Sequence, residues 1–565
     1  MVQRPDMERK PLIAQSDQSL LLDAHDPAFD EARAELSAFA TLEKSPEHFH
    51  AYRLDALSLW NAASAGLSPD SVVATMQRWT RYELPPSLEQ SVRETMARFG
   101  RVILSSGPDA KTLRLSCDDH FVRAEMAASK RLGKYLEPDG DGFLVALTER
   151  GTVKRELMKL GWPALDEAPL VDGDPFPLAL RALRTNGAGF GLRAYQEDAV
   201  RAFTGRGAPG TGYGVIVMPC GAGKTIVGMA AMSAIGRKTL IITTNVAAVH
   251  QWMDELLDKT DVSRENLGEY TGAAKDVRPI TIATYQVLTW RPDKQSDFPH
   301  FDLFRREHWG LIIYDEVHLL PAPVFRVVAE IQAIRRLGLT ATLIREDGLQ
   351  EDVFSLIGPK RYDVPWKELE AKGFIAEAFC REIRVPMSDH DRLRYVACST
   401  RERHRVAAEN QIKKRVVREL LDNHSEDLVM VIGQFLSQLH DLAADLGAPL
   451  ITGAMPNPER ERIYADFRSG KVKVIVVSRV ANFAIDLPDA SVAIQISGTF
   501  GSRQEEAQRL GRILRPKAKN SYFYSIVSRY SVEEEYADNR RRFLTEQGYR
   551  YTIEAWEESE WAPTN

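Results

Sequence analysis

Residues 218–225, Met-Pro-Cys-Gly-Ala-Gly-Lys-Thr, have the composition of a phosphate-binding loop. They follow a short apolar run at 214–217 and precede a segment with helical spacing. Glycine lets backbone N–H groups turn inward at a helix N-terminus, where an anion is stabilised. The strict pattern has glycine where this chain has Met218, but the strand–loop–helix setting restores the prediction. The predicted binding residues are Gly221, Ala222, Gly223, Lys224 on the β- and γ-phosphates, and Thr225 on Mg²⁺.

Two adjacent carboxylates, Asp315 and Glu316, end another apolar run at 311–314. Such a pair is common on protein surfaces, but its place after a buried strand and downstream of a phosphate loop favours catalysis. We predict that Asp315 holds Mg²⁺, through water, and that Glu316 orients and deprotonates the attacking water.

A third group of chemical residues lies in the segment 504–515, which has the composition of a helix. Gln508, Arg512 and Arg515 are spaced by four and three residues, so they share one helix face. Two guanidiniums on one face suit a γ-phosphate whose charge spreads in the transition state. The alternative is a solvated helix whose arginines pair with neighbouring glutamates. With the loop on one domain and the arginines on another, ATP would lie between them and its hydrolysis would open and close the cleft.

The sequence pattern predicts that the elements positioning these residues form two tandem α/β domains. Short β-branched runs alternate with helical stretches after residue 191, which is typical of a parallel sheet covered on both faces. The same alternation of β-branched runs and helical stretches occurs again after a basic stretch near residues 376–425. The apolar runs lie at 214–217, 239–242, 280–283, 311–314, 428–432, 472–477, 492–496 and 521–524.

Composition limits the remaining function classes. The 565 residues include 73 Lys and Arg against 79 Asp and Glu, a net charge of −6, which excludes a uniformly basic coat but not a local basic groove. The four cysteines form no Cys-x-x-Cys pair, which argues against zinc, iron–sulfur and disulfide frameworks. We expect a reducing, cytoplasmic compartment, with no membrane span and no secretory signal.

The first 100 residues carry two helical patterns and then a short strand. Ser68 caps a predicted helix that contains Val72, Met76 and Trp79, and a second helix begins near Ser87. A strand is expected at 101–104. Two helices and a strand favour either a winged-helix unit or a small helical packing domain, and both readings stay open.

A local excess of positive charge lies at residues 381–420, which hold eleven Lys or Arg and six Asp or Glu. The segment looks helical and shows no strand pattern. If its cations touch phosphates, they would bind DNA without reading sequence. A solvated pair of charged helices is the alternative. The candidate DNA contacts here are Arg401, Arg403, Arg405, Lys413, Lys414 and Arg415.

Together these motifs resemble superfamily-two helicases, and within them the XPB (xeroderma pigmentosum group B) DNA repair helicases. The resemblance covers roughly residues 190–550. It implies two RecA-like domains that bind ATP and Mg²⁺, with Arg193 and Gln196 contacting adenine. The matching segments, in the family's order, are 192–196, 219–225, 245–252, 284–286, 315–318, 337–342, 480–488 and 508–515.

Two further features resemble the XPB family in particular. Arg345, Glu346 and Asp347 match its RED element, which the resemblance implicates in opening duplex DNA. The basic segment lies where the family carries its thumb, which grips DNA. Ala484 stands where many helicases have glycine, which is a departure from their fifth motif.

Motif position also implies roles for coupling and DNA contact. His318 would link the ATP site to the segment 340–342, although a buried structural histidine is the alternative. Each threonine among the DNA candidates has the alternative of a strand-end or capping hydroxyl. The coupling candidates are His318, Thr340, Ala341 and Thr342; the DNA candidates are Thr243, Thr284, Tyr285 and Arg479.

We therefore expect an α/β protein with two tandem RecA-like parallel-sheet motor domains, an N-terminal α+β region and a helical thumb insert. The expected function is ATP-driven 3′→5′ opening of DNA at single-stranded/duplex junctions in nucleotide excision repair, alongside repair proteins or a partner nuclease. Duplex translocation without strand separation, and a nuclease scaffold with weak ATPase activity, are the alternatives. The expected domains are 1–100 (helical or winged-helix-like), 101–185 (damage-recognition-like, with a linker), 186–375 and 426–565 (the motors), and 376–425 (the thumb).

Overall fold

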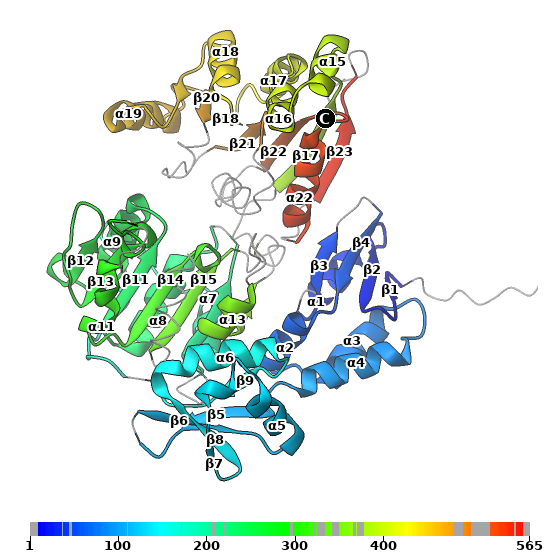
Figure 1. Ribbon diagram of the computed structural model, residues 1–565. Helices are drawn as coiled ribbons and strands as arrows, with labels where there is room; N and C mark the ends of the chain where they lie inside the picture. The colour runs from blue at the N-terminus through cyan, green and yellow to red at the C-terminus, as the bar shows by residue number, and fades with distance from the viewer. Residues whose placement is uncertain are drawn as a thin grey trace, which may run out of the picture. The chain divides into compact units, whose positions relative to one another are not determined.

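The computed structural model divides the chain into two compact units (Figure 1). One contains residues 1–218 and 223–364, and the other contains 219–222 and 365–565. Among the described residues, no helix is both long and apolar enough to span a bilayer. The structure describes residues 10–36, 38–44, 48–109, 111–170, 172–205, 211–219, 221–293, 298–320, 324, 334–341, 350–364, 369, 378–478, 490–498, 520–546 and 550–557.

The amino-terminal region forms a four-stranded antiparallel sheet in the order β1-β2-β4-β3, with four helices. The two helices expected from the sequence are present, and the Ser68 hydroxyl caps the first of them by accepting from the Ser71 N–H. The sheet was not expected from the sequence. The elements are β1 (Leu12–Ala14), β2 (Ser19–Asp23), α1 (Phe29–Leu36), β3 (Thr41–Lys44), β4 (Phe49–Arg53), α2 (Ala56–Ser64), α3 (Pro69–Trp79) and α4 (Pro86–Ala97).

A second small sheet, in the order β7-β8-β6-β5-β9, follows in the chain. The strand expected at 101–104 is the start of β5, which pairs with β6 and β9 and not with the preceding helices' sheet. The winged-helix combination of two helices with this strand is therefore wrong. The elements are β5 (Val102–Ser106), β6 (Thr112–Ser116), α5 (His120–Ala128), β7 (Glu137–Asp139), β8 (Gly142–Ala146), α6 (Arg150–Lys159) and β9 (Ala164–Asp166).

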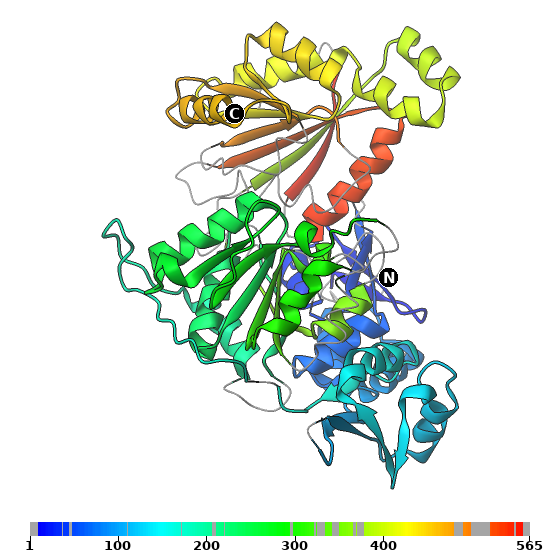
Figure 2. The ribbon, with the colours of Figure 1, turned by 60° about the vertical axis from the view of Figure 1, so that its left-hand side comes forward.

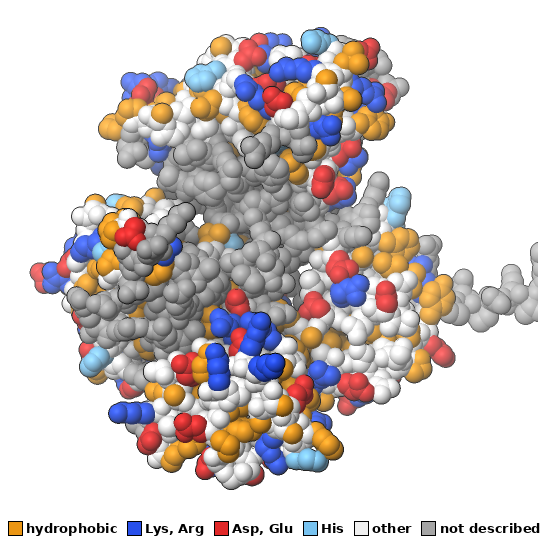
Figure 3. Space-filling view, viewed as in Figure 1, with side chains coloured by type: hydrophobic (Ala, Val, Ile, Leu, Met, Phe, Trp, Pro, Cys, Tyr) orange, Lys and Arg blue, Asp and Glu red, His pale blue; other side chains and the backbone are white. Residues whose placement is uncertain are grey.

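This region packs against the part of the unit that follows it in the chain. Trp60, Met158 and Phe354 form a small buried apolar cluster, and the Asn61 side chain accepts from the Lys360 N–H at 3.0 Å. On the face shown in Figure 3, Lys and Arg side chains gather over α6, where Arg155 and Lys159 are partly exposed.

The first large sheet has seven parallel strands in the order β12-β13-β11-β14-β15-β10-β16. Helices lie along both of its faces (Figure 2). The four apolar runs expected before residue 320 are its strands β10, β11, β13 and β14. The elements are α7 (Ala194–Thr204), β10 (Tyr213–Val217), α8 (Lys224–Ile235), β11 (Thr239–Thr243), α9 (Val246–Lys259), β12 (Leu267–Tyr270), β13 (Ile280–Thr284), α10 (Tyr285–Leu288), α11 (Leu303–Arg306), β14 (Leu311–Asp315), β15 (Arg335–Thr340), α13 (Gln350–Leu356) and β16 (Lys360–Asp363).

The second large sheet repeats the first. Its seven parallel strands run in the order β19-β20-β18-β21-β22-β17-β23, so both sheets read 3-4-2-5-6-1-7 when strands are counted along the chain. Two tandem parallel-sheet α/β domains are thereby confirmed. The elements are β17 (Ala378–Val385), α15 (Asp389–Ala397), α16 (Thr400–Ala408), α17 (Ile412–Asn423), β18 (Val429–Gly433), α18 (Leu436–Leu446), β19 (Leu450–Ile451), α19 (Asn457–Arg468), β20 (Val474–Ser478), β21 (Val492–Gln495), β22 (Ser521–Ser528), α22 (Val532–Glu546) and β23 (Arg550–Ala555).

The basic segment 381–420 is only partly helical, contrary to the prediction. Its first residues belong to β17, an inner strand paired with both β22 and β23. The strand was hidden by Arg381, Glu382 and Arg384, whose charges break the apolar pattern. Glu382 is nonetheless fully buried, because Arg384 and Tyr551 both donate to its carboxylate. The remainder of the segment forms α15, α16 and the start of α17.

Candidate active site

The candidate site lies at the carboxyl edge of the first parallel sheet, where β10, β14 and β15 end as neighbours. Ligands of open parallel sheets bind at this edge. Gly223 has φ +85°, a left-handed conformation that favours glycine, and α8 begins at the next residue, Lys224. A side chain at Gly223 would also collide with the Gln196 amide, 2.5 Å from the position of a Cβ. The loop therefore requires glycine for its backbone, and a Cβ there would displace the end of the Gln196 side chain.

Lys224 and Glu316 form the central ion pair of the site. The Lys224 Nζ lies 3.4 Å from Glu316 Oε1, and both side chains are largely buried. Burial raises the pKa of Glu316, but the Lys224 ammonium and His318 outweigh it, so the pKa is lowered overall. Glu316 is therefore held ionised, as a base must be before it accepts a proton.

Glu316 also has an unusual backbone. Its φ of 50° and ψ of 54° are left-handed, which costs about 1 kcal/mol or more for a residue with a side chain. The Ala341 N–H donates to its carboxylate from the end of β15. Such strain persists only where the surrounding contacts fix it, and it concentrates at functional sites.

The pKa of Asp315 is shifted in the opposite direction from that of Glu316. Burial and the neighbouring Glu316 charge raise its pKa to about 6, against the hydrogen bond from Trp252 and the attraction of Lys224. The Trp252 Nε1–H donates to Asp315 Oδ2 at 2.9 Å. Two carboxylates beside one lysine leave an excess of negative charge, which suits a hard divalent cation.

His318 lies between the carboxylates and β15. Its Nδ1 is 2.7 Å from the Thr340 hydroxyl and 3.6 Å from Glu316 Oε2. The structure thus places Thr340 on the His318 ring, and His318 and Ala341 on the Glu316 carboxylate, while their role in coupling stays a prediction. The fourth coupling candidate, Thr342, lies outside the described residues.

Gln196 lies against the phosphate loop rather than on the surface. It is 2% exposed, and its Oε1 accepts from the Arg193 N–H at 3.0 Å as a cap of α7. The Arg193 guanidinium donates to the Tyr195 hydroxyl. Adenine contact by Arg193 and Gln196 stays a prediction, now with Gln196 placed beside Gly223.

Three DNA candidates from motif position serve the protein interior instead. The buried Thr243 hydroxyl donates to backbone carbonyls, and the Thr284 hydroxyl caps α10 by accepting from the Val287 N–H. Tyr285 is 4% exposed and donates its hydroxyl to the Asp315 carbonyl at 3.1 Å. Their prediction as direct phosphate contacts is corrected, because each polar group is buried and already has an internal partner.

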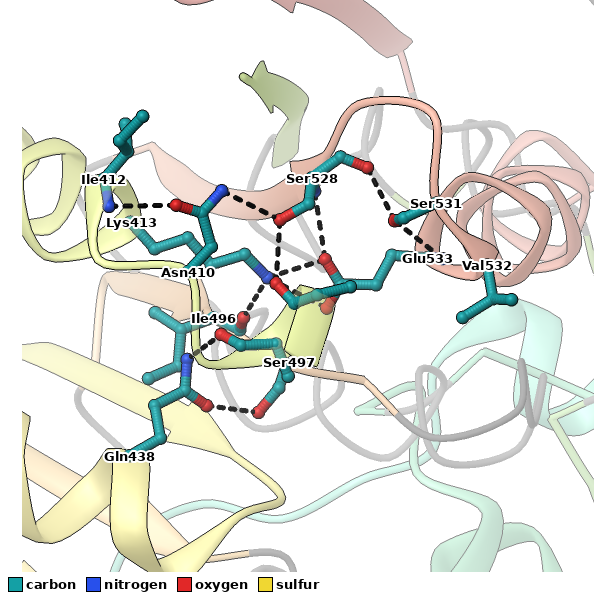
Figure 4. Close-up of polar contacts among 12 residues, drawn as sticks. Asn410, Ile412, Lys413, Gln438, Ile496, Ser497, Ser528, Ser531, Val532 and Glu533 are labelled. Carbon is teal, nitrogen blue, oxygen red and sulfur yellow. Dashed lines mark hydrogen bonds and ion pairs between the residues drawn. The ribbon is translucent and has the colours of Figure 1, made fainter. Parts of the chain in front are cut away.

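Lys413, a predicted DNA contact, is buried in the second unit (Figure 4). Its ammonium donates to the Ile496 carbonyl at 2.8 Å and to both Glu533 oxygens at 2.7 and 2.8 Å. Glu533 also accepts from the Ser528 N–H. A lysine held in this way cannot reach a phosphate, so the prediction for Lys413 is wrong.

The other cations of the basic segment differ in exposure. Arg405 is exposed and pairs with Glu409, whereas Lys414 is half-buried and pairs with Asp441. Arg403 is half-buried over the Tyr395 ring, and Arg415 is exposed. Arg405 and Arg415 are the members that remain accessible to DNA. The side chain of Arg401, and the candidates Arg345, Glu346, Asp347, Arg479, Gln508, Arg512 and Arg515, lie outside what the structure describes.

The contact of Trp252 with Asp315 was not predicted from the sequence. Trp252 lies on the buried face of α9 with Val249, Met253 and Leu256, so its spacing indicates core packing only. Nothing in the sequence pairs its indole N–H with a carboxylate 63 positions away.

Three family models match separate parts of this chain. The ERCC3/RAD25/XPB C-terminal helicase model matches residues 369–560, and the type III restriction enzyme res subunit model matches residues 189–345. A model described as a helicase conserved C-terminal domain matches residues 12–138, at the amino end of this chain.

Curated relatives resemble the chain over nearly its whole length. It is 49% identical over 548 residues to a protein of Kineococcus radiotolerans named DNA 3'-5' helicase XPB, with 96% of each chain covered. It is 49% identical to the protein of the same name from Mycobacterium tuberculosis, with 96% of this chain and 97% of that one covered. It is 34% identical to the Encephalitozoon cuniculi general transcription and DNA repair factor IIH helicase/translocase subunit XPB, with 98% and 84% covered.

Proposed function

The chain belongs to the XPB family of DNA 3′→5′ helicases, and we propose that it hydrolyses ATP at the carboxyl edge of its first parallel sheet to move along DNA. The observation that carries this proposal is the convergence of Lys224, Asp315 and Glu316 on that edge, with His318 bonded to Thr340. Each of these residues has a role in phosphoryl transfer that its position allows.

The phosphate loop would hold the nucleotide. Backbone N–H groups at Gly221 to Gly223 would contact the phosphates, with Lys224 on the β- and γ-phosphates. The Thr225 hydroxyl follows Lys224 in the first turn of α8, and together with Asp315 it supplies the oxygen ligands that Mg²⁺ prefers. When bound, Mg²⁺ would neutralise charge on the phosphate oxygens.

Glu316 would act as the base. Its lowered pKa keeps the carboxylate ready to accept a proton from the attacking water, and its left-handed backbone fixes where the side chain starts. The Ala341 N–H and the His318 ring lie on the same carboxylate. A change at β15 would therefore reach Glu316 directly.

The second motor domain would complete the site. We assign residues 186–375 to the first motor and 426–565, together with the inner strand β17 (Ala378–Val385), to the second. The helical remainder of 376–425 would be the thumb, 1–100 an N-terminal domain, and 101–185 a damage-recognition-like domain with its linker. Gln508, Arg512 and Arg515 would clamp the γ-phosphate from the second motor as it leaves.

DNA would be gripped through its backbone and opened at a junction. The exposed guanidiniums of Arg405 and Arg415 suit phosphate contacts. By its resemblance in sequence, the segment 345–347 would act as the duplex-opening element. We place the protein in the cytoplasm and in nucleotide excision repair, with repair proteins or a nuclease as partners.

Strand displacement tests this function. A duplex with a 3′ single-stranded tail should be separated by the wild-type protein in the presence of ATP and Mg²⁺, a 5′-tailed duplex should not, and Lys224→Ala should separate neither. A triplex-displacement assay run beside it addresses the alternative. If ATP drives triplex displacement but no strand separation, the protein is a duplex translocase. If neither occurs, a scaffold with weak ATPase activity becomes the better description.

A further inference from the structure

Asp315 is held on two sides by aromatic side chains from different helices. The Trp252 indole N–H, from α9, donates to the Asp315 Oδ2 at 2.9 Å. The Tyr285 hydroxyl, from α10, donates to the Asp315 backbone carbonyl at 3.1 Å. Both rings are buried, at 1% and 4% exposure. One residue is therefore fixed at its carboxylate by one aromatic and at its backbone by the other.

The carboxylate contact determines the orientation of Asp315. Its Oδ1 accepts from the Glu316 N–H at 3.1 Å, and Oδ2 accepts from Trp252, so the plane of the carboxylate is fixed. Each oxygen keeps a second lone pair for water or a cation. Trp252 thus fixes which lone pairs of the Asp315 carboxylate face a ligand.

The indole also fits its place closely. A side chain at Gly228 of α8 would meet the Trp252 ring at 2.5 Å, so α8 leaves room for it only because residue 228 is glycine. The Trp252 ring therefore packs between α8, which begins with Lys224, and the strand that ends in Asp315. Its N–H is held in one position relative to both.

The backbone contact precedes the strained residue. Glu316 follows Asp315 with φ 50°, and Tyr285 anchors the carbonyl of the peptide that joins them. Tyr285 is itself the first residue of α10, whose cap is the Thr284 hydroxyl. Gln286, the next residue, donates to the Thr244 carbonyl, just before α9 begins. The two aromatic contacts are therefore connected at the edge of the sheet.

We propose that Trp252 is a positioning residue that orients the Asp315 carboxylate for a divalent cation, and that Tyr285 fixes the backbone that presents it. This inference rests on the proposed function, because it concerns the cation that accompanies ATP. Outer partners of metal-binding carboxylates commonly change metal affinity by about 10–100-fold when removed.

The test compares two buried tryptophans of the same unit. Trp309 is 0% exposed and donates its indole N–H to the Leu303 carbonyl, so Trp309→Phe loses a similar ring and one hydrogen bond away from the site. Binding of Mn²⁺ in the presence of ADP, followed by electron paramagnetic resonance, reports the cation without turnover. Trp252→Phe should weaken Mn²⁺ binding by about 10-fold or more, with metal-free ADP binding unchanged, and Trp309→Phe should not. Equal Mn²⁺ affinity in the two variants would overturn the proposal.

A second variant keeps the test informative if Trp252→Phe does not fold. Tyr285→Phe removes only a hydroxyl, and should weaken Mn²⁺ binding by about threefold. Its matched control is Tyr213→Phe, because Tyr213 is equally buried and donates to the Asp166 backbone carbonyl at 2.8 Å, away from the site. Identical Mn²⁺ affinities in these two variants would count against the role of Tyr285. If the wild-type protein itself binds no Mn²⁺ with ADP, the proposed function fails instead.

Discussion

The two large sheets share one topology, yet the same edge is built for different purposes in each. In the first, Lys224 follows the first strand and reaches Glu316 at the end of the fifth. In the second, Lys413 lies in α17, the last helix before the second strand, and reaches the Ile496 carbonyl at the end of the fifth. The strand order alone therefore does not decide which edge performs chemistry.

The difference lies in the balance of charge within each group of residues. The Lys413 ammonium has three donors and makes three hydrogen bonds, two of them to the Glu533 carboxylate (Figure 4). At the Lys224 site two carboxylates share one lysine, their pKa values are pushed apart, and Glu316 has a strained backbone. We call these the closed cluster (Lys413, Glu533) and the open cluster (Lys224, Asp315, Glu316). The excess negative charge of the open cluster suits a cationic ligand, whereas the closed cluster stabilises the fold.

The largest expected effect tests the open cluster. Glu316→Gln removes the base but keeps the size of the side chain, and should lower kcat for ATP by about 10²–10⁴-fold. Its melting temperature should stay equal or fall, because the ion pair with Lys224 that holds Glu316 ionised is lost. Phosphate release and thermal unfolding check both. A variant with normal kcat would show that another group takes the proton.

Substitution in the closed cluster should lower the free energy of unfolding. Lys413→Ala leaves the Glu533 carboxylate buried without its cation, which should cost about 3–5 kcal/mol of unfolding free energy. The neighbouring Lys414 pairs with a partly exposed Asp441, so Lys414→Ala should cost less than about 1 kcal/mol. Urea unfolding measures both. Equal stabilities, with DNA affinity lost only in Lys413→Ala, would restore the original DNA prediction.

A third cluster, formed by Arg150, Lys154, Asp166 and Arg336, extends the comparison. Its side chains are buried, and its three cations outnumber its one carboxylate. Asp166 accepts from Arg150 and from Lys154, and the buried Arg336 lies close enough to repel both cations. Burial, opposed by Asp166 and reinforced by the two arginines, lowers the pKa of Lys154 to about 8.

The pH dependence of stability follows from this shift. The unfolded lysine keeps its proton up to a pKa near 10.5, while the folded one releases it above about 8. Between these values the unfolded state binds more protons, so stability rises with pH. The unfolding free energy of the wild type relative to Lys154→Met should therefore increase from pH 8 upward, by at most about 3 kcal/mol. A difference that stays constant with pH would contradict the assignment.

The smallest expected effect concerns a cap. Thr284→Ala removes the hydroxyl that accepts from the Val287 N–H, and should cost about 1 kcal/mol while DNA affinity stays unchanged. Thr289→Ala is the control, since its hydroxyl donates to carbonyls within the same short helix and caps no N-terminus. Weaker DNA binding in Thr284→Ala alone, measured at two salt concentrations, would return Thr284 to the DNA interface.

The residues of the open cluster could be selected from the sequence because the patterns that mark them are local, and the structure brings Lys224 and Glu316 together. A glycine loop after an apolar strand can be recognised within a few residues of the sequence, and so can two carboxylates after another strand. The closed cluster could not be predicted, because the partner of Lys413 lies 120 positions away and the lysine itself looks like a surface cation. The strand β17 was missed for the same reason, since the partners of Glu382 include the distant Tyr551.

The orientation of Asp315 shows a further limit of the sequence. The spacing of Trp252 indicates a core residue, and burial indeed places it there. Only the fold shows that its single polar atom meets the carboxylate. Roles that depend on one hydrogen bond between distant elements are therefore found from coordinates, whereas loops and strand ends can be predicted from the chain.

The most direct test of the account compares Lys224→Ala with Lys413→Ala in one measurement, DNA-stimulated phosphate release per folded molecule at a temperature well below the melting point of either variant. We predict that Lys224→Ala loses the DNA-stimulated rate, while Lys413→Ala keeps a rate close to that of the wild type. Retained hydrolysis in Lys224→Ala, or an equal loss in both variants, would contradict the assignment of the open cluster as the site of ATP hydrolysis.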